Sequence, residues 1–452
     1  MESLQAAGVE TSGFSLGFEQ WRALAEADAE KAARHFYSRL ERCAPEAVRA
    51  ALTQTPDAAT LARRFAKSLT REAAPLRGVP YLLKDMFDVA GQPTTCGSKF
   101  FSKVRPLPET SCALQRRLEK LGGVYAGKTL MDEFGFGNSG ANAHYGDVPH
   151  PRFPEFLAGG SSSGAAWAVG SGLVPVAFGS DGDGSLRIPA GFCGLYGYRF
   201  HPNALAADGA CPLAPTLDAA GFLTSRMGDL RATLDALLPK SVAEPQPELR
   251  GIFIDEISAP LMPELRRQYF QLARALQTDS DAAYRTSLAQ IFRKSGHALS
   301  IIQSREAYAL HREWLDRYQV VYDSAVWKRI NRGRNWRSAE VEFAAQKQRD
   351  IQEIFFEYFQ DFDFLLLPAT HAAAPFKDEV TQEFRDELLA FNAPASLARL
   401  PVLTLPVFTG ERLSGGLQVI LPNNRPEPIH QILRQASRYY EQQRSSKMPF
   451  AR

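Results

Sequence analysis

The chain reads GGSSSG at residues 159–164 and SDGDGSLRIP at residues 180–189. Ser161 in the first segment and Ser185 in the second are both surrounded by glycine and other small residues. Small residues let a backbone approach a ligand closely and point successive N–H groups toward it. The two segments are therefore the first place in this sequence to look for both the fold and a site.

The residues between the two serines predict how they are brought together. Residues 164–172 are rich in alanine and predict a helix that starts directly at the first serine segment. Residues 173–178 are apolar and predict a buried strand that ends just before the second segment. A loop, a helix, a strand and a second loop would place Ser161 and Ser185 close together in an α/β layout.

Hydrophobic periodicity in the rest of the chain also alternates between helix and strand. The predicted elements are helices over residues 18–70, 111–121 and 429–443, and strands over residues 79–83, 124–126, 362–368, 402–407 and 416–421. We therefore expect an α/β protein with an N-terminal helical segment over residues 1–75 and a larger domain over residues 76–452. That domain includes a largely helical region at about 263–360, and the whole is expected to form one compact domain.

Lys84 directly follows the apolar run at residues 79–83. A lysine paired with a serine is one variant of serine nucleophile catalysis. Lysine ordinarily has a pKa of about 10.4 and is charged at neutral pH, so it can act as a base only if its pKa is lowered. Burial has that effect, and the apolar run suits a buried position. The alternative is a surface lysine paired with Asp85.

Ser185 is the candidate nucleophile, because it follows residues 182–184, whose backbone N–H groups could stabilise an oxyanion. Ser161 is the candidate that relays a proton between Lys84 and Ser185. Each serine also has a plain structural interpretation. A Gly/Ser loop can simply be a turn, and Ser161 could cap the helix that follows it.

Several motifs in order resemble those of the amidase signature family, and the similarity extends from about Leu76 to the end of the chain. The motifs that carry this resemblance are GVPYLLKD at 78–85, GKTLMDEF at 127–134, the two serine segments, FCGLYG at 192–197, LLLP at 365–368, FNAP at 391–394 and GLQVI at 416–420.

The resemblance implies a mixed central β-sheet covered by helices on both faces. It also implies a triad of Lys84 as base, Ser161 as relay after a cis peptide bond, and Ser185 as nucleophile. Backbone groups of Gly182, Asp183 and Gly184 would form the oxyanion hole, and Asp181 and Arg187 would brace the loop. No metal ion or organic cofactor is implied.

Asp183 departs from the family pattern, which usually has glycine or another small neutral residue at that position. Its backbone N–H can still donate a hydrogen bond. A carboxylate facing the site would oppose a developing oxyanion, disfavour anionic substrates and favour cationic ones. The side chain could instead face away from the site, and the sequence leaves both orientations open. Residues 198–201 also depart from the pattern, and they are interpreted as a loop with little bearing on the chemistry.

The expected function is hydrolysis of a carboxamide bond in a small-molecule or peptide-type substrate, through a serine acyl-enzyme, to give a carboxylic acid and ammonia or an amine. The alternatives are the glutamine-hydrolysing A subunit of a tRNA-dependent amidotransferase and a non-catalytic binding protein with the same fold. Esters could be cleaved by the same chemistry. The expected substrate contacts are Phe136, Asn138, Asn142 and Tyr145, with more of the pocket wall from residues 300–340.

Charge and cysteine content narrow the expected partners and compartment. The 452 residues include 52 Lys and Arg and 50 Asp and Glu, a net charge of +2, which predicts no direct nucleic-acid partner. The basic run at residues 328–337 is interpreted as a solvated helix end and loop. Five scattered cysteines and no recognisable signal peptide favour the cytoplasm, with no membrane attachment. A homodimer or a partner subunit remains open.

Overall fold

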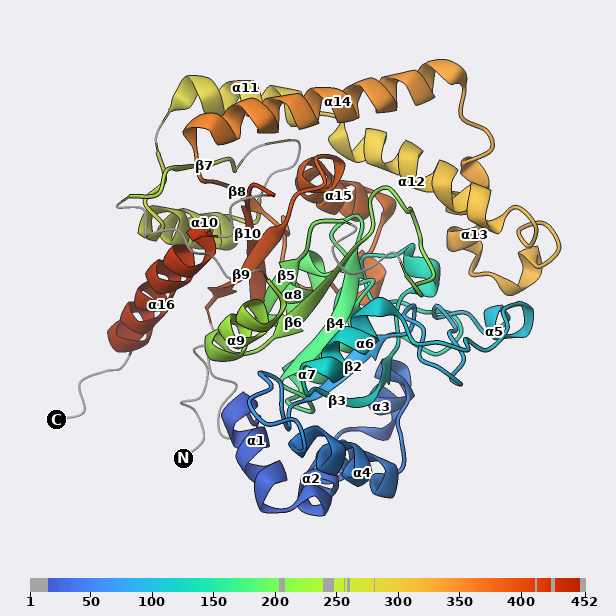
Figure 1. Cartoon of the computed structure of the whole chain (residues 1–452). Coiled ribbons are helices and arrows are strands. Elements are labelled where there is room, and N and C mark those ends of the chain that lie inside the picture. The colour runs from blue at the N-terminus through green and yellow to red at the C-terminus, as the bar shows by residue number, and fades with distance from the viewer. Residues whose placement is uncertain are drawn as a thin grey trace.

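The structure is a computed structural model that describes residues 15–202, 208–238, 248–255, 257, 261–279, 281–410, 413–423 and 427–447. These residues form one ten-stranded sheet in the order β1-β3-β2-β4-β6-β5-β9-β10-β8-β7 (Figure 1). The strands are β1 Leu52–Gln54, β2 Pro80–Lys84, β3 Val124–Thr129, β4 Val176–Asp181, β5 Tyr196–Arg199, β6 Ala219–Thr224, β7 Gly251–Phe253, β8 Phe364–Pro368, β9 Val402–Thr409 and β10 Leu413–Ile420.

The sheet is mixed, as the sequence predicted. Strand β2 runs parallel to both β3 and β4, and β7 runs parallel to β8. The other neighbouring strands pair in antiparallel fashion. Because β2 and β4 are parallel neighbours, the residues that end them, Lys84 and Asp181, lie at the same edge of the sheet. Such edges, at the carboxyl ends of parallel strands, are where α/β proteins usually bind ligands.

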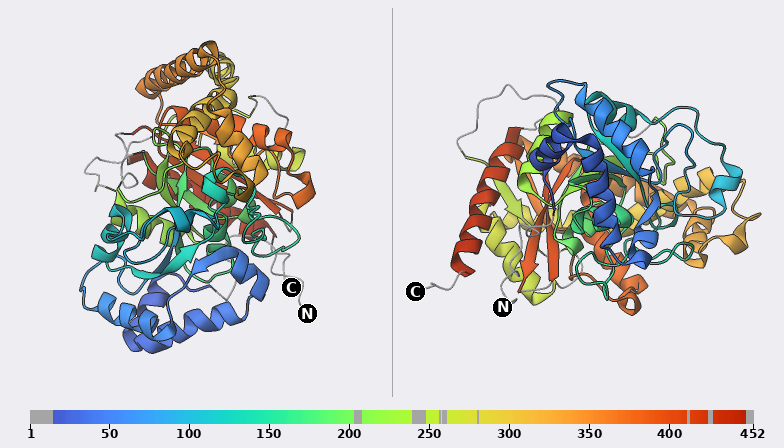
Figure 2. Two further views of the ribbon diagram at one scale, coloured as in Figure 1. Left: turned by 90° about the vertical axis from the view of Figure 1, so that its right-hand side faces the viewer. Right: turned by 90° about the horizontal axis from the view of Figure 1, so that it is seen from below.

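Helices cover both faces of the sheet, which confirms the predicted α/β class. Along β2, Tyr81 and Leu83 enter one apolar cluster, whereas Leu82 between them enters a second cluster. This alternation is the period-two pattern of a strand buried on both faces. Figure 2 shows the sheet from two further directions, with helices on each side.

Helices α1–α4 gather at one end of the molecule, and α11, α12 and α14 gather at the opposite end (Figures 1 and 2). The helices are α1 Phe18–Ala27, α2 Ala29–Glu41, α3 Pro45–Ala51, α4 Ala58–Leu69, α5 Phe101–Val104, α6 Ala113–Lys120, α7 Ser163–Gly170, α8 Arg187–Cys193, α9 Met227–Leu237, α10 Pro263–Ala275, α11 Ala282–Phe292, α12 Ser295–His311, α13 Ser324–Arg332, α14 Ser338–Asp361, α15 Gln382–Leu397 and α16 Glu427–Lys447. In the described part of the chain, no helix is long and apolar enough to cross a membrane.

The N-terminal segment is less purely helical than the sequence predicted. Between α3 and α4 it contributes β1, whose Leu52 pairs with Thr129 of β3. Without β1, the outer edge of β3 would present unpaired backbone N–H and C=O groups, and pairing with β1 provides hydrogen-bond partners at that edge. Residues 1–14 of the predicted segment 1–75 lie outside the described residues. The predicted helical region at about 263–360 corresponds to α10–α14.

Helix α7 packs so tightly against the sheet that one of its glycines has no room for a side chain. A Cβ atom on Gly164 would lie 2.2 Å from the carbonyl oxygen of Ala51 and 2.8 Å from the amide nitrogen of Leu130. Both are backbone atoms, so they cannot rotate away. The close contact brings the start of α7, and with it Ser161, against the end of α3 and the residue that follows β3.

We therefore expect Gly164→Ala to lower the free energy of unfolding by about 1–3 kcal/mol, the usual cost of overpacking a well-packed core. The matched control is Gly228→Ala, because Gly228 also lies in a helix, α9, and has no atom within 4 Å of an added Cβ. That control should be neutral or slightly stabilising. Urea denaturation of both variants checks the expectation, and equal effects would contradict it.

Candidate active site

Lys84, Ser161 and Ser185 form one continuous row of hydrogen bonds. The Nζ of Lys84 donates to the Oγ of Ser161 at 2.7 Å, and that hydroxyl donates to the Oγ of Ser185 at 2.9 Å. The three side chains come from the end of β2, from the loop before α7 and from the loop after β4, and all three are buried. The peptide bond between Gly160 and Ser161 is cis. The structure thus brings together the three residues expected to form the triad.

Lys84 is fully enclosed, and this environment changes its acidity. Burial lowers the pKa of its ammonium group to about 8, although the nearby carboxylates of Asp132, Asp183, Asp218 and Asp181 favour the charged form. The Nζ also donates to the Oγ of Ser180 at 2.9 Å, a contact that the sequence analysis did not anticipate. A pKa near 8 leaves a useful fraction of the neutral amine close to neutral pH.

The carboxylate of Asp183 faces the site, which resolves the orientation that the sequence left open. Its Oδ1 accepts a hydrogen bond from the Oγ of Ser185 at 2.8 Å, and its Oδ2 accepts one from the Nε2 of Gln303 at 3.0 Å. Burial raises the pKa of this carboxyl group, against the two hydrogen bonds that favour its charged form. Gln303 lies on α12, and the sequence contained no local signal that linked it to Asp183.

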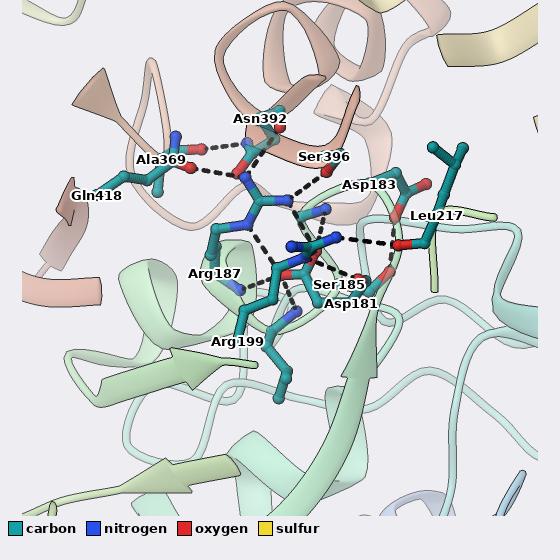
Figure 3. Close-up of polar contacts among 12 residues, drawn as sticks. Asp181, Asp183, Ser185, Arg187, Arg199, Leu217, Ala369, Asn392, Ser396 and Gln418 are labelled. Atoms are coloured by element: carbon teal, nitrogen blue, oxygen red, sulfur yellow. Dashed lines mark hydrogen bonds and ion pairs between the residues drawn. The ribbon is translucent and has the colours of Figure 1, made fainter. Parts of the chain in front are cut away.

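Asp181 is the centre of a buried ionic network that holds the loop of Ser185 (Figure 3). Its two carboxylate oxygens accept hydrogen bonds from Arg187 at 2.7 and 2.9 Å and from the backbone N–H of Gly184 at 2.8 Å. The Nε of Arg199 donates to the carbonyl oxygen of Asp181 at 3.0 Å. Burial opposes ionisation of Asp181, but the charges of Arg187 and Arg199 outweigh it and hold the pKa of the carboxyl group below its usual range.

Arg199 corrects the interpretation of residues 198–201 as a loop with little bearing on the site. Residues 196–199 are strand β5, and the Arg199 side chain is completely buried beside Asp181. Its remaining nitrogens donate to the carbonyl oxygens of Leu217 and Leu400. A buried arginine inside a sheet is expensive unless it is paired, and Asp181 supplies the opposite charge.

The structure also corrects the expected role of Gly184 as an oxyanion donor, because its N–H group donates to Asp181 instead. Gly184 is required for its conformation, with a φ of +111° and an added Cβ only 2.8 Å from Asn392. The N–H groups of Gly182 and Asp183 have no acceptor among the residues that the structure describes. Only these two of the three expected donors therefore remain available to a substrate.

A cavity of about 520 Å³ opens beside Asp183 and is bordered by α12, α13 and α15. Phe136 and Asn138, two of the four expected substrate contacts, line it, as do residues of the 300–340 region. Its lining residues are Phe136, Gly137, Asn138, Asp183, Ile257, Lys294, Gly296, His297, Ser300, Gln303, Ser304, Arg329, Arg332, Trp336, Gln382, Arg385, Asp386, Leu389 and Ala390.

The other two expected contacts, Asn142 and Tyr145, do not line this cavity. The amide of Asn142 instead donates to the carbonyl oxygens of Gly97 and Met131, and its Oδ1 accepts from the N–H of Tyr145. Asn142 thus links the segments that contain Gly97, Met131 and Tyr145. In the described residues, no three His, Cys, Asp or Glu side chains gather closely enough to hold a metal ion.

Comparison with known proteins identifies the family of this chain. A family model described as Amidase matches residues 31–250. A glutamyl-tRNA(Gln) amidotransferase subunit of Chromohalobacter salexigens is 30% identical over 406 residues, which cover 78% of this chain and 81% of that protein. A solved structure titled "Crystal structure of amidase" superposes with a TM-score of 0.79 at 25% identity and covers 95% of this chain and 100% of its own.

The chain belongs to the amidase signature family. An indoleacetamide hydrolase of Pseudomonas syringae pv. syringae is 40% identical over 175 residues, which are 39% of this chain and 39% of that protein. For four relatives, including two indoleacetamide hydrolases, the matched stretch spans only 34% to 39% of the relative's own length.

Proposed function

We propose that this protein hydrolyses carboxamide bonds through a covalent acyl-enzyme on Ser185. The observation that carries the proposal is the buried row of hydrogen bonds from Lys84 through Ser161 to Ser185. Membership of the amidase signature family and the similarity to named amide hydrolases support it.

In the proposed mechanism, neutral Lys84 accepts a proton from Ser161 while Ser161 accepts the proton of Ser185. The Oγ of Ser185 then attacks the amide carbon, and the N–H groups of Gly182 and Asp183 stabilise the oxyanion that forms. Ser161 and the Lys84 ammonium return the proton to the leaving nitrogen, so that ammonia or an amine departs. In the second half, water attacks the acyl carbon and gives a proton to Lys84 through Ser161. The bond between that carbon and the Oγ of Ser185 then breaks, the Oγ takes the proton back, and the carboxylic acid leaves.

Asp183 imposes one requirement on this mechanism. In the structure the Ser185 hydroxyl donates to Asp183, so its proton points away from Ser161. The hydroxyl must rotate toward Ser161 before the proton can move to Lys84. A substrate that breaks the hydrogen bond from Ser185 to Asp183 would free the hydroxyl for this rotation.

A second candidate is the glutamine-hydrolysing component of a tRNA-dependent amidotransferase, favoured by the match to an amidotransferase subunit over 78% of this chain. We prefer the simple amidase. In this proposal the protein acts in the cytoplasm, as a single chain or as a homodimer. Activity of the purified chain alone toward a small amide would favour the amidase. Activity that appears only after a partner subunit is added would favour the amidotransferase.

We expect a fluorophosphonate probe to label the wild-type protein on Ser185, because an activated serine attacks phosphorus readily. Labelling should disappear in Ser185→Ala and fall strongly in Lys84→Ala. The matched control is Ser163→Ala, because Ser163 is buried in the same segment and its Oγ has no hydrogen-bond partner among the described residues. The control should label like the wild type, and labelling that persists in Ser185→Ala would reject the assignment.

A further inference from the structure

The cavity next to Asp183 is lined by more positive than negative side chains. Four cationic side chains line it, against the two carboxylates of Asp183 and Asp386. A cleft lined mainly by one sign of charge attracts ligands of the opposite sign. The cationic residues are Lys294, Arg329, Arg332 and Arg385.

The three arginines are not paired directly with carboxylates of the described residues, although the charge of Arg385 acts on the buried carboxylate of Asp132. None of them lies within ion-pair distance of a carboxylate in the described part of the chain. Arg329 uses one nitrogen to donate to the carbonyl oxygen of Phe136 at 2.6 Å, and the guanidinium of Arg332 stacks 4.0 Å from the ring centre of Trp336. By contrast, Arg334 on the neighbouring turn is paired through two nitrogens with Asp316.

Two donors in the same cavity are buried without an acceptor. The Nδ2 of Asn138 and the Nε of Arg385 are both inaccessible to solvent and have no hydrogen-bond partner among the described residues. Asn138 itself is only 5% exposed. Leaving a buried donor unpaired costs free energy, so such groups are typically matched by a ligand or a bound water.

From the sequence, a carboxylate of Asp183 that faces the site is expected to favour cationic substrates, but in the structure this carboxylate already has hydrogen-bond partners within the protein. Both oxygens of Asp183 accept hydrogen bonds, one from Ser185 and one from Gln303. The unpaired groups just described are donors, and one of them belongs to a guanidinium group. Guanidinium groups pair with planar carboxylates through two parallel hydrogen bonds.

We propose that the substrate of this protein is a small amide that carries a carboxylate group remote from the scissile bond, and that Asn138, Arg329 and Arg385 bind that carboxylate. This inference rests on the proposed amidase function and names its substrate class. The cavity of about 520 Å³ is large enough for such a molecule. None of the three triad residues lines it, but Asp183 does, and the hydrogen bond from Ser185 to Asp183 identifies the end of the cavity nearest the nucleophile.

The test compares three amides of equal chain length that end in a carboxylate, a methyl group or an ammonium group. The first are monoamides of dicarboxylic acids, with two to five methylene groups to find the spacing. We expect kcat/KM for the carboxylate amide to exceed that of the methyl amide by about 10- to 100-fold, as for hydrogen bonds to a charged group. A methyl or ammonium amide hydrolysed equally well or better would overturn the proposal while leaving the amidase function intact.

Variants then assign the preference to the arginines. In Arg329→Gln and Arg385→Gln the ratio of kcat/KM between the carboxylate and methyl amides should fall several-fold, mainly through a higher KM. Arg385→Lys keeps the positive charge but loses the planar guanidinium group that can donate two parallel hydrogen bonds to a carboxylate, so it should give an intermediate ratio. Arg334→Gln is the matched control and should leave the ratio unchanged. A ratio that stays the same in both cavity variants would overturn the assignment.

A binding measurement keeps the proposal testable if no amide is hydrolysed. We expect glutarate to bind the Ser185→Ala protein in calorimetry, and expect glutaramide, its neutral diamide, to bind at least tenfold more weakly. Arg385→Gln should weaken glutarate binding. Glutarate binding without hydrolysis of any amide would support the carboxylate site but reject the amidase function. No glutarate binding, or tighter binding of inorganic phosphate, would overturn the proposal.

Discussion

Lys84→Ala should lower kcat/KM for an amide substrate by about 10²–10⁴-fold, the range that general acid–base catalysis supplies. Lys84 is the group at the end of the proton path, and no other amine contacts Ser161 in the described residues. Lys84→Arg should be about as inactive, because a guanidinium stays charged and cannot accept the proton. Steady-state kinetics of both variants checks this, and substantial activity in Lys84→Arg would contradict the role as base.

The pH dependence gives a second, independent measure of the same role. Below a pH of about 8 Lys84 carries its proton and cannot accept another, so kcat/KM should rise as the pH increases through that value. Asp183→Asn removes a negative charge that favours the ammonium form, so the rising limb should move to lower pH. If the rise of kcat/KM occurred at the same pH in Asp183→Asn as in the wild type, Asp183 would have no effect on the pKa of Lys84.

Asp181→Ala should lower the free energy of unfolding by about 3–5 kcal/mol, because it leaves the buried guanidinium groups of Arg187 and Arg199 without their counter-charge. It also frees the N–H of Gly184 and should release the loop of Ser185, so labelling by the fluorophosphonate probe should fall as well. Urea denaturation with the m-value checked measures the first effect.

The matched control for this variant is Asp28→Ala. Asp28 also accepts two backbone hydrogen bonds, but it caps α2 on the exposed surface. Its loss should cost about 1 kcal/mol, the usual effect of removing a helix cap, and leave labelling unchanged. If Asp181→Ala destabilised the protein no more than this control, the buried network would not be a major source of stability.

The sequence predicted those parts of the fold and site that have strong local patterns. Strands β2 and β4 and helix α7 were recognised because apolar or small residues run unbroken through them. Strands β1, β5, β6 and β7 were missed. Residues 219–224, which form β6, read AAGFLT and show no alternation, because both faces of that strand are buried.

The missed site residues share a different cause. Arg199, Gln303 and Ser180 act through partners that are distant in the chain or on neighbouring strands, and nothing near them in the sequence points to those partners. Gln303, for example, lies 120 residues from Asp183. Such contacts follow from how the sheet and α12 are arranged, which periodicity does not specify.

The anchoring of Arg187 has a consequence for protein synthesis. Besides Asp181, its guanidinium group contacts three groups on α15 and β10, which follow Arg187 by 205 to 231 residues (Figure 3). They are the carbonyl oxygen of Asn392, the hydroxyl of Ser396 and the amide oxygen of Gln418. Gln418 is 231 residues downstream of Arg187. A nascent chain that carries both serines but has not yet released α15 and β10 from the ribosome therefore lacks these three contacts. The loop of Ser185 acquires its full set of contacts only after Gln418 has emerged.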